Sequence, residues 1–522
     1  MSTKSESAIE EELEQRQVSQ GPACHPTAPS DEFFDVSTTV DPSYIISLIR
    51  KLVPLDDRIG DKHLGVDAYG ASVQLSKAEG TEENAVLLAE NGVLRETNNH
   101  NVAMGTVDDF DKSSGCEGGE DGLEGKVEIS EARDIWEEHG CVLWDLAASK
   151  THAEFMVQNF VLEVLLANLI VQQSARVKEI SLGIIGNLAC HEESRKHIAL
   201  AKGLIEAIVD QLFLDDTLCL CEACRVLTLG LQGAECVMWA KALQSDSILS
   251  RVLWIVENAL NPQLIEKSVG LLLAILEGEQ DVVATLLPPL MQLGLPSLLT
   301  NLLTFEMTKL SGERLPERYG ALDLILRTIE ALSVIDNYSK EISSSREIFP
   351  LLIDLVKFPD KIEVASSCVT AAVLIANILT DVADLTEEIS HDFSFLQGLF
   401  DVFPLASEDT EARSALWSII GRLLARVQEN QMSLSTVYQY VAVLVSKSEL
   451  IEDELLDCQS DNSSANAKSS ARSAALRNII CILSRWINSK DSIEDCNFME
   501  DDHVNDVTVD KLLKCCRKYT GT

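Results

Sequence analysis

The sequence predicts an all-α protein built as an α-solenoid, in which about six to seven helical units stack side by side. Two observations predict this fold. From Ser130 onward, apolar residues recur at helical spacing, and the same pattern returns at intervals near or above about 40–47 residues. A chain of 522 residues with 46% hydrophobic residues can bury a large core in this way, because a repeat array grows by adding units to a stack.

The clearest repeat unit lies between Val177 and Leu212. An apolar stripe runs from Val177 to Leu188, a polar turn follows at His191 to Ser194, and a second apolar helix surrounds Gly203. This is the unit from which armadillo and HEAT arrays are stacked, and an irregular all-α domain is the alternative. Similar helix openings recur at Leu218, Leu264, Tyr319, Ile362, Glu411 and Ala471.

The N-terminal region differs from the array in its charge. The first 140 residues hold 30 acidic and 11 basic side chains. Residues 1–38 predict a disordered acidic segment, and residues 55–129 predict an acidic linker that contains glycine. Between them, residues 39–54 predict an amphipathic helix that packs on the array, with Asp41 as its cap and Pro42 in its first turn.

The remaining boundaries follow from the same patterns. Residues 130–490 predict the armadillo-like repeat domain, with a flexible insert near 457–470. Residues 491–522 predict a C-terminal tail with a short helix.

The uncharged stretch from Val282 to Phe305 is long enough to cross a bilayer, but it is interrupted by proline and glycine. We expect Pro288 and Pro289 to end one helix, Gly294 to form the turn and Pro296 to start the next helix.

The formal charge of −41 restricts the expected partners. Affinity for nucleic acid or for an anionic membrane comes from basic groups, so neither is expected here. Basic or extended protein segments are the favoured partners, and no small-molecule substrate is expected. The first 20 residues have no apolar stretch, so we expect neither a secretory leader nor a secreted protein. The 14 cysteines are expected to be thiols.

Motifs of catalysis and metal binding are incomplete. His191 and His197 lie six residues apart, whereas a zinc protease needs two histidines on one face of a helix. Cys219, Cys221 and Cys224 lack the second cysteine pair of a zinc site and are expected to pack between helices. The sequence therefore predicts no enzyme, no metal and no cofactor; an enzyme with an unfamiliar site stays an alternative.

Two segments resemble known families. GNLA at Gly186 to Ala189 and the following AKGLIEAIVDQL resemble an armadillo repeat. Trp144-Asp145-Leu146, Phe155, Val177 to Ile180 and Gly183 to Cys190, together with the helix at 39–54, resemble the Saal family, the serum amyloid A-like or synoviocyte-proliferation-associated proteins. The resemblance implies an armadillo-type, non-enzymatic protein associated with cell proliferation. It also implies the nucleus as location, with the cytoplasm as a second compartment.

Three asparagines are candidate partner-binding residues. In armadillo arrays the third helix of each repeat lines the concave face, where an asparagine can bond both backbone groups of an extended peptide. Asn187, Asn377 and Asn478 stand at such positions. The alternative is that each amide bonds neighbouring backbone. Import adaptors of this fold place a tryptophan one turn earlier, which this chain lacks, so an import receptor is not expected.

Four residues are expected to have structural roles. Gly183 and Gly186 predict close helix contact, because glycine lowers helix stability by about 1 kcal/mol against alanine. Trp144, followed by Asp145, is expected to anchor the start of the array. The leading hypothesis is a scaffold or adaptor for protein partners. A chaperone cofactor that exchanges nucleotide on Hsp70 is the alternative, since it needs the same fold and no catalytic motif.

Overall fold

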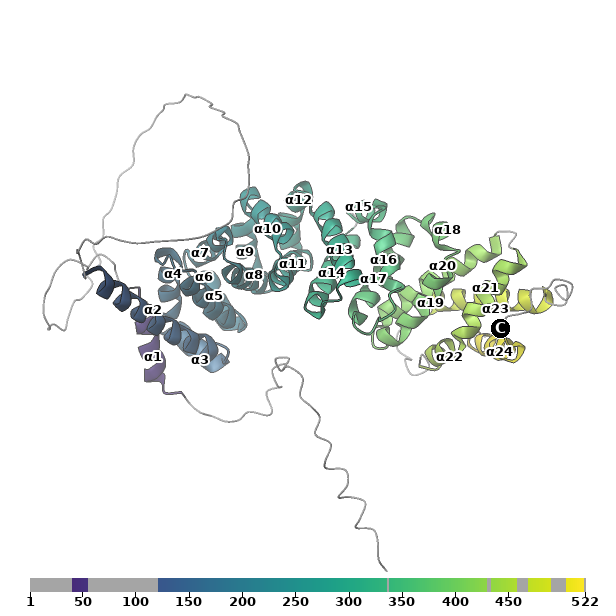
Figure 1. Ribbon diagram of the computed structural model, residues 1–522, viewed down its shortest axis with the longest axis horizontal. Helices are drawn as coiled ribbons and strands as arrows, with labels where there is room; N and C mark the ends of the chain where they lie inside the picture. Colours follow the sequence, from purple (N-terminus) through teal and green to yellow (C-terminus); the bar gives the residue numbers. More distant parts are fainter. Residues whose placement is uncertain are drawn as a thin grey trace, which may run out of the picture.

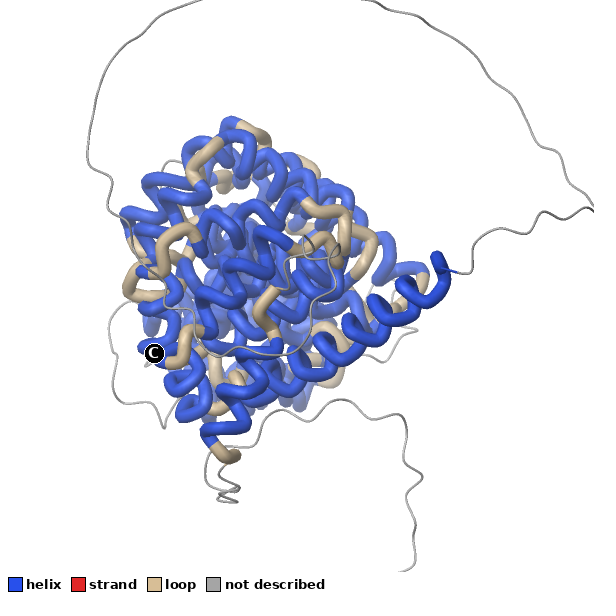
Figure 2. The backbone as a smooth tube through the Cα atoms, turned by 90° about the vertical axis from the view of Figure 1, so that its left-hand side faces the viewer, coloured by secondary structure: helices blue, strands red, loops and turns tan. Residues whose placement is uncertain are grey.

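The described part of the chain is entirely helical. A computed structural model describes residues 40–54, 121–335, 338–429, 433–457, 468–489 and 504–520. The helices lie side by side along one long axis (Figure 1), and the end-on view shows helices and loops without strands in those ranges (Figure 2). The predicted all-α solenoid is confirmed.

Seven consecutive triplets of helices form the array within these ranges. The three-helix unit is that of armadillo repeats. The first three triplets are α3 (Lys150–Gln158), α4 (Val161–Val171) and α5 (Ala175–Ala189); α6 (Glu192–Leu200), α7 (Leu204–Asp210) and α8 (Thr217–Leu231); and α9 (Cys236–Leu243), α10 (Asp246–Asn258) and α11 (Pro262–Leu276). The other four are α12 (Gln280–Gln292), α13 (Leu295–Gly312) and α14 (Tyr319–Ser333); α15 (Ser339–Ser344), α16 (Ile348–Val356) and α17 (Ala365–Asp381); α18 (Leu385–Ile389), α19 (Phe393–Val402) and α20 (Thr410–Glu429); and α21 (Leu434–Ser446), α22 (Ser448–Asp457) and α23 (Lys468–Ser489).

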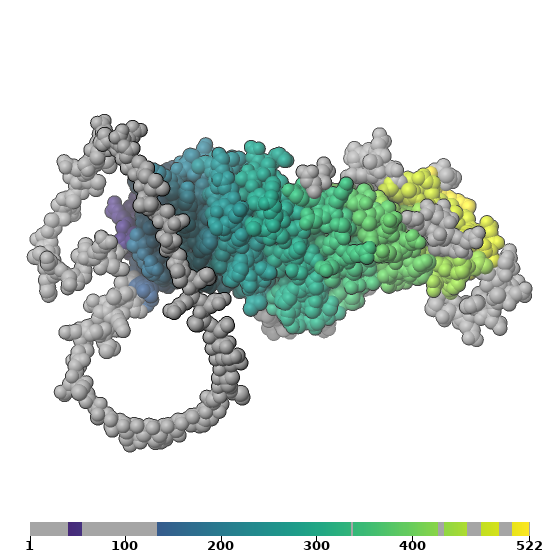
Figure 3. Space-filling view, turned by 90° about the horizontal axis from the view of Figure 1, so that it is seen from above, coloured from purple at the N-terminus to yellow at the C-terminus, as the bar shows by residue number. Residues whose placement is uncertain are grey.

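The third helices of the triplets make one continuous layer. It begins with α2 (Asp121–Leu146), which precedes the first triplet, and continues through the third helices α5, α8, α11, α14, α17, α20 and α23. Each of these helices packs on the next. We call this the third-helix layer. Because each third helix lies between two others, nearly all of its apolar residues are buried, and one core runs through the array. The surface is correspondingly continuous from one end to the other (Figure 3).

Short helices cover both ends of the layer. At the N-terminal end, α1 (Pro42–Lys51) packs on α2 and α3 and buries Ile45, Leu48, Ile49 and Leu52. Asp41 caps α1 by accepting a hydrogen bond from the Ser43 amide. The Leu52 carbonyl accepts bonds from Trp136 Nε1 (3.2 Å) and Asn168 Nδ2 (2.9 Å). At the other end, α24 (Asp506–Thr520) packs on α23.

One predicted boundary is wrong. The linker was expected to continue to residue 129, but α2 begins at Asp121. Gly122 and Gly125 suggested a linker, yet glycine only weakens a helix by about 1 kcal/mol, and the leucine, glutamates and lysine beside them favour helix. The predicted disordered segment 1–38, linker residues 55–120 and insert residues 458–467 lie outside the described residues.

The long apolar stretch forms two helices, with one difference from the expectation. Gly294, with φ 94°, separates α12 from α13, and Pro296 lies in the first turn of α13. Pro288 and Pro289, however, lie inside α12 and do not end it. Each proline lacks a backbone donor and crowds the preceding turn, but its carbonyl still accepts, and the Pro289 carbonyl accepts a bond from the Leu293 amide (2.9 Å). No single described helix meets the length and hydropathy of a membrane span, although the pairs α3–α4 and α12–α13, each bent by 75°, meet them jointly.

Candidate protein-binding surface

The predicted anchor Trp144 packs on a glycine of the next third helix. A Cβ atom added to Gly183 in α5 would come closer than 3.0 Å to the ring of Trp144 in α2. The glycine therefore makes room for the indole. Asp145 is exposed, and its carboxylate makes no hydrogen bond or ion pair in the described ranges, so no contact there assigns it a structural role.

The nitrogen and the oxygen of the Asn187 side-chain amide are both hydrogen-bonded within the chain. Its Nδ2 donates to the Trp144 carbonyl (2.8 Å), and its Oδ1 accepts from Arg225 Nη1 (3.1 Å). Arg225 comes from α8, donates to the Gly183 carbonyl (3.1 Å) and pairs with Glu222. Its guanidinium occupies the space where a Cβ of Gly186 would stand. The sequence analysis missed Arg225, whose signal is a pair of opposite charges, Glu222 and Arg225, three residues apart in an otherwise apolar helix.

The other two asparagines have the same kind of contact. Asn377 Nδ2 in α17 donates to Ser333 Oγ in α14 (3.2 Å), and Asn478 Nδ2 in α23 donates to the Gly421 carbonyl in α20 (2.9 Å). Each amide thus bonds the preceding third helix: Asn478 bonds backbone, as in the alternative considered above, whereas Asn377 bonds a side-chain hydroxyl. The three residues lie on separate helices and do not converge. Their role in partner binding stays a prediction.

Carboxylates gather where the third-helix layer passes from α11 to α20. The pKa of Glu330 in α14 is raised to about 7, first by burial and then by the negative charges of Glu411, Asp409 and Glu277. Arg327 opposes this shift and lies 3.4 Å from Glu277. Carboxylates from α14, from the C-terminal end of α11 and from the start of α20 therefore share one region of negative potential.

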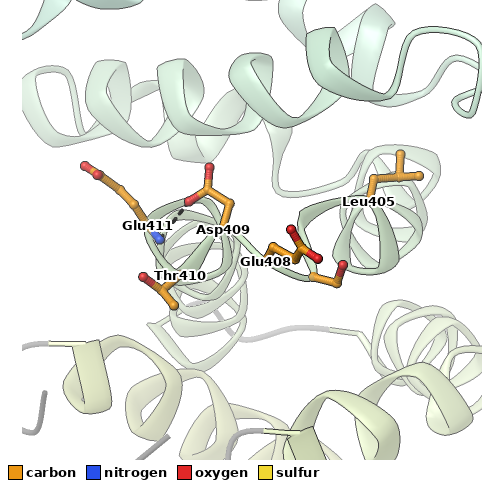
Figure 4. A pocket seen from close by; sticks show the side chains of 6 residues that line it. Leu405, Glu408, Asp409, Thr410 and Glu411 are labelled. Atoms are coloured by element: carbon orange, nitrogen blue, oxygen red, sulfur yellow. Dashed lines mark hydrogen bonds between the residues drawn. The ribbon is translucent and has the colours of Figure 1, made fainter. Parts of the chain in front are cut away.

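An overlapping group of carboxylates, which shares Asp409 and Glu411 with the first, surrounds two hollows. We define the acidic rim as Asp360, Glu363, Asp401, Glu408, Asp409 and Glu411, from the loop before α17, the end of α19 and the start of α20. One hollow, of about 540 Å³, is lined by Leu405 and residues 407–411 (Figure 4). The other, of about 360 Å³, is lined by Leu405, Asp401 and residues 359–363.

The carboxylates of the acidic rim differ in their partners. Asp360 pairs with Arg314, Asp401 pairs with Lys447 (2.6 Å), and Glu363 accepts a hydrogen bond from the Tyr319 hydroxyl (2.9 Å). Asp409 caps α20 by accepting from the amides of Glu411 and Ala412, the first of which is drawn in Figure 4. The side chains of Glu408 and Glu411 are exposed and have no cationic partner in the described ranges.

The cysteines of α8 are buried thiols. Burial raises the pKa of Cys219 to about 12, of Cys221 to about 11 and of Cys224 to about 12, so each stays protonated at neutral pH. Cys219 also donates to the Ala175 carbonyl of the neighbouring third helix (3.1 Å). Among the described residues, no three histidine, cysteine or acidic side chains are grouped to hold a metal ion.

Comparison with known proteins supplies relatives over part of the chain. No protein-family model matches it. Over 215 residues the chain is 25% identical to Protein saal1 of Danio rerio, a match that covers 40% of this chain and 45% of that protein. The chain resembles the Saal proteins. Protein SAAL1 of Homo sapiens is 26% identical over 142 residues, which are 27% of this chain and 30% of the human protein.

The resemblance predicted from the sequence is thus confirmed, and the chain spans less than half the length of these relatives. Among solved structures, an engineered protein is 15% identical with a TM-score of 0.40, covering 74% of this chain and 96% of that chain. A designed armadillo repeat protein in complex with the peptide (KR)4 is 15% identical with a TM-score of 0.38, covering 47% and 94%.

Proposed function

We propose that this chain is a non-catalytic scaffold that binds protein partners through Lys- and Arg-rich extended segments. The observation that carries the proposal is the gathering of Glu277, Glu330, Asp409 and Glu411 along the third-helix layer. Carboxylates that repel one another are stabilised when a cation is placed among them, because the cation favours their charged forms. A basic segment supplies several such cations at once.

The architecture supports the same function. A stack of third helices presents an extended, rigid surface, which suits an extended chain better than a compact ligand. The charge of −41 attracts basic segments before contact, within a Debye length of about 8 Å at physiological ionic strength. Protonated thiols in α8 supply no nucleophile at this surface.

Titration of a labelled Lys/Arg-rich peptide against the full chain tests the proposal. We expect fluorescence anisotropy to show binding that weakens between low and physiological salt, and no binding of a peptide with glutamate at the same positions. Glu277→Gln with Glu330→Gln should weaken binding. Binding should also strengthen as the pH rises through about 7, where Glu330 loses its proton. Absence of binding at low salt would contradict the scaffold function proposed here.

The finer parts of this function come from resemblance. Residence in the nucleus and association with cell proliferation stay predictions, which imaging of the tagged full chain in resting and dividing cells would test. The Hsp70 cofactor alternative makes an opposite kinetic prediction. A scaffold leaves the release of labelled nucleotide from Hsp70 unchanged, whereas an exchange factor accelerates it.

A further inference from the structure

An exposed isoleucine lies at the edge of the acidic rim. Ile362, in the loop before α17, is 85% exposed, the highest value among the described large hydrophobic side chains. Pro359 and Leu405 line the same hollow. Nothing in the described part of the chain covers this apolar face. Exposed apolar side chains that adjoin a hollow are typical of a surface that another molecule covers.

Leu405 links this apolar face to a second hollow in the next repeat. Leu405, in the short helix η4 (Phe403–Ala406) after α19, lines both hollows. The hollow beside Ile362 belongs to the loop before α17, and the hollow beside Glu411 belongs to the loop before α20. The two hollows adjoin at Leu405, and α17 and α20 are neighbours in the third-helix layer. An extended segment can follow such a surface, whereas a compact ligand would fill one hollow only.

The charges around this face determine which segment it fits. All six residues of the acidic rim carry carboxylates, and the cations Arg314 and Lys447 are already paired with two of them. Lys361 is nine-tenths buried, and its Nζ donates to the Phe358 carbonyl. Glu408 and Glu411 line one hollow with Leu405, and Glu363 and Asp401 line the other hollow with Leu405. Leu405 is therefore an apolar side chain shared by two hollows, each of which also carries carboxylates.

We propose that Ile362, Leu405 and the acidic rim dock an extended partner segment in which one large apolar residue is flanked on both sides by Lys or Arg. The apolar side chain packs between Ile362 and Leu405, and the flanking cations pair with the carboxylates on either side. This inference rests on the proposed function and deepens it, because it assigns the basic segment to one surface and adds an apolar requirement.

The test uses the full chain and three labelled peptides. The first has one leucine between Lys/Arg pairs, the second has serine in place of the leucine, and the third has glutamate in place of the basic residues. We expect the first to bind best, the serine peptide about tenfold more weakly because it lacks the apolar contact, and the glutamate peptide not at all. Equal binding of the leucine and serine peptides would overturn the apolar part of the site.

Variants of the chain test whether the peptides bind at Ile362 and the acidic rim. Ile362→Ser should weaken binding of the leucine peptide about tenfold and leave binding of the serine peptide unchanged. The melting temperature of this variant should equal that of the wild type, since Ile362 is exposed. The double variant Glu408→Gln with Glu411→Gln should weaken the binding of both basic peptides about fivefold. The matched control is Glu163→Gln with Glu206→Gln, two exposed first-turn glutamates of α4 and α7, which should have no effect.

The outcomes separate this inference from the proposed function. If neither basic peptide binds, the scaffold function is wrong and the docking site with it. If both bind but the rim variants behave like the Glu163 and Glu206 control, the docking site alone is wrong. Self-association that Ile362→Ser abolishes would assign the face to a second copy and would also overturn the proposal.

Discussion

The ring of Trp144 occupies the space in which a Cβ atom of Gly183 would stand, and the backbone carbonyl of Trp144 accepts a hydrogen bond from Asn187. Two contacts one helical turn apart therefore join α2 to α5. Arg225 extends the same arrangement to α8, because it bonds both Gly183 and Asn187. The first three members of the third-helix layer are fixed to one another by side chains as well as by their apolar faces.

Gly183→Ala should destabilise the chain by about 1–3 kcal/mol, because the added methyl group displaces the Trp144 ring. Alanine is the better helix former, so propensity alone predicts the opposite sign. Gly270→Ala is the matched control. Gly270 lies inside α11, where an added Cβ meets no atom within 4 Å beyond its chain neighbours and the backbone of its own helix, and this substitution should stabilise by about 0.5–1 kcal/mol. Urea unfolding of both variants measures the difference; equal stabilities would contradict the close packing of Trp144.

Asn187→Ala should lower the free energy of unfolding by about 1–3 kcal/mol, because Arg225 loses an acceptor and the Trp144 carbonyl loses a donor. Asn377→Ala should have a smaller effect, since its amide donates to the Ser333 hydroxyl, which can turn to another partner. Thermal unfolding measures both. If the Asn187→Ala variant is as stable as the wild type but no longer binds basic peptides, the asparagine belongs to the partner site instead.

Glu330 should make the chain less stable as the pH rises. Its folded pKa of about 7 lies above its ordinary 4.5, so the folded state binds the proton more tightly than the unfolded state between these values. Stability therefore falls as the pH rises from about 4.5 to about 7. Glu330→Gln removes this dependence, and its advantage in melting temperature should grow from pH 5 to pH 8. A constant advantage over that range would show that Glu330 ionises normally in the folded chain.

The thiols of α8 should react slowly in the folded chain. Burial holds the pKa values of Cys219, Cys221 and Cys224 at about 11 to 12, so the reactive thiolate is scarce at pH 7, and the side chains are also inaccessible. Among the ten cysteines that the structure describes, exposed Cys190 and Cys481 should react first with a thiol reagent. Alkylation at increasing urea, followed by mass spectrometry, measures the order. Early labelling of Cys224 would contradict its burial.

Periodicity in the sequence located the third helices well. The openings predicted at Val177, Leu218 and Tyr319 lie inside or at the start of α5, α8 and α14, and the opening at Ile362 precedes α17 by three residues. The third helix of each repeat is covered on most sides by its neighbours, so it must be apolar over most of its surface. This burial requirement is visible in a single sequence. Most first and second helices are shorter, and apart from the break between α12 and α13 their boundaries were not predicted individually.

The partners of polar side chains were decided only by the folded chain. The sequence indicated that Gly183 and Trp144 make close contacts, because a glycine inside an apolar helix needs a reason. It did not indicate that Arg225 would bond Asn187, or that Glu330 and Glu411 would influence one another across two repeats. Helical spacing determines which face of a helix is buried, since it depends on neighbours in the chain. The rotation of one repeat against the next determines which charges meet, and it follows from the packing of residues about forty or more positions apart.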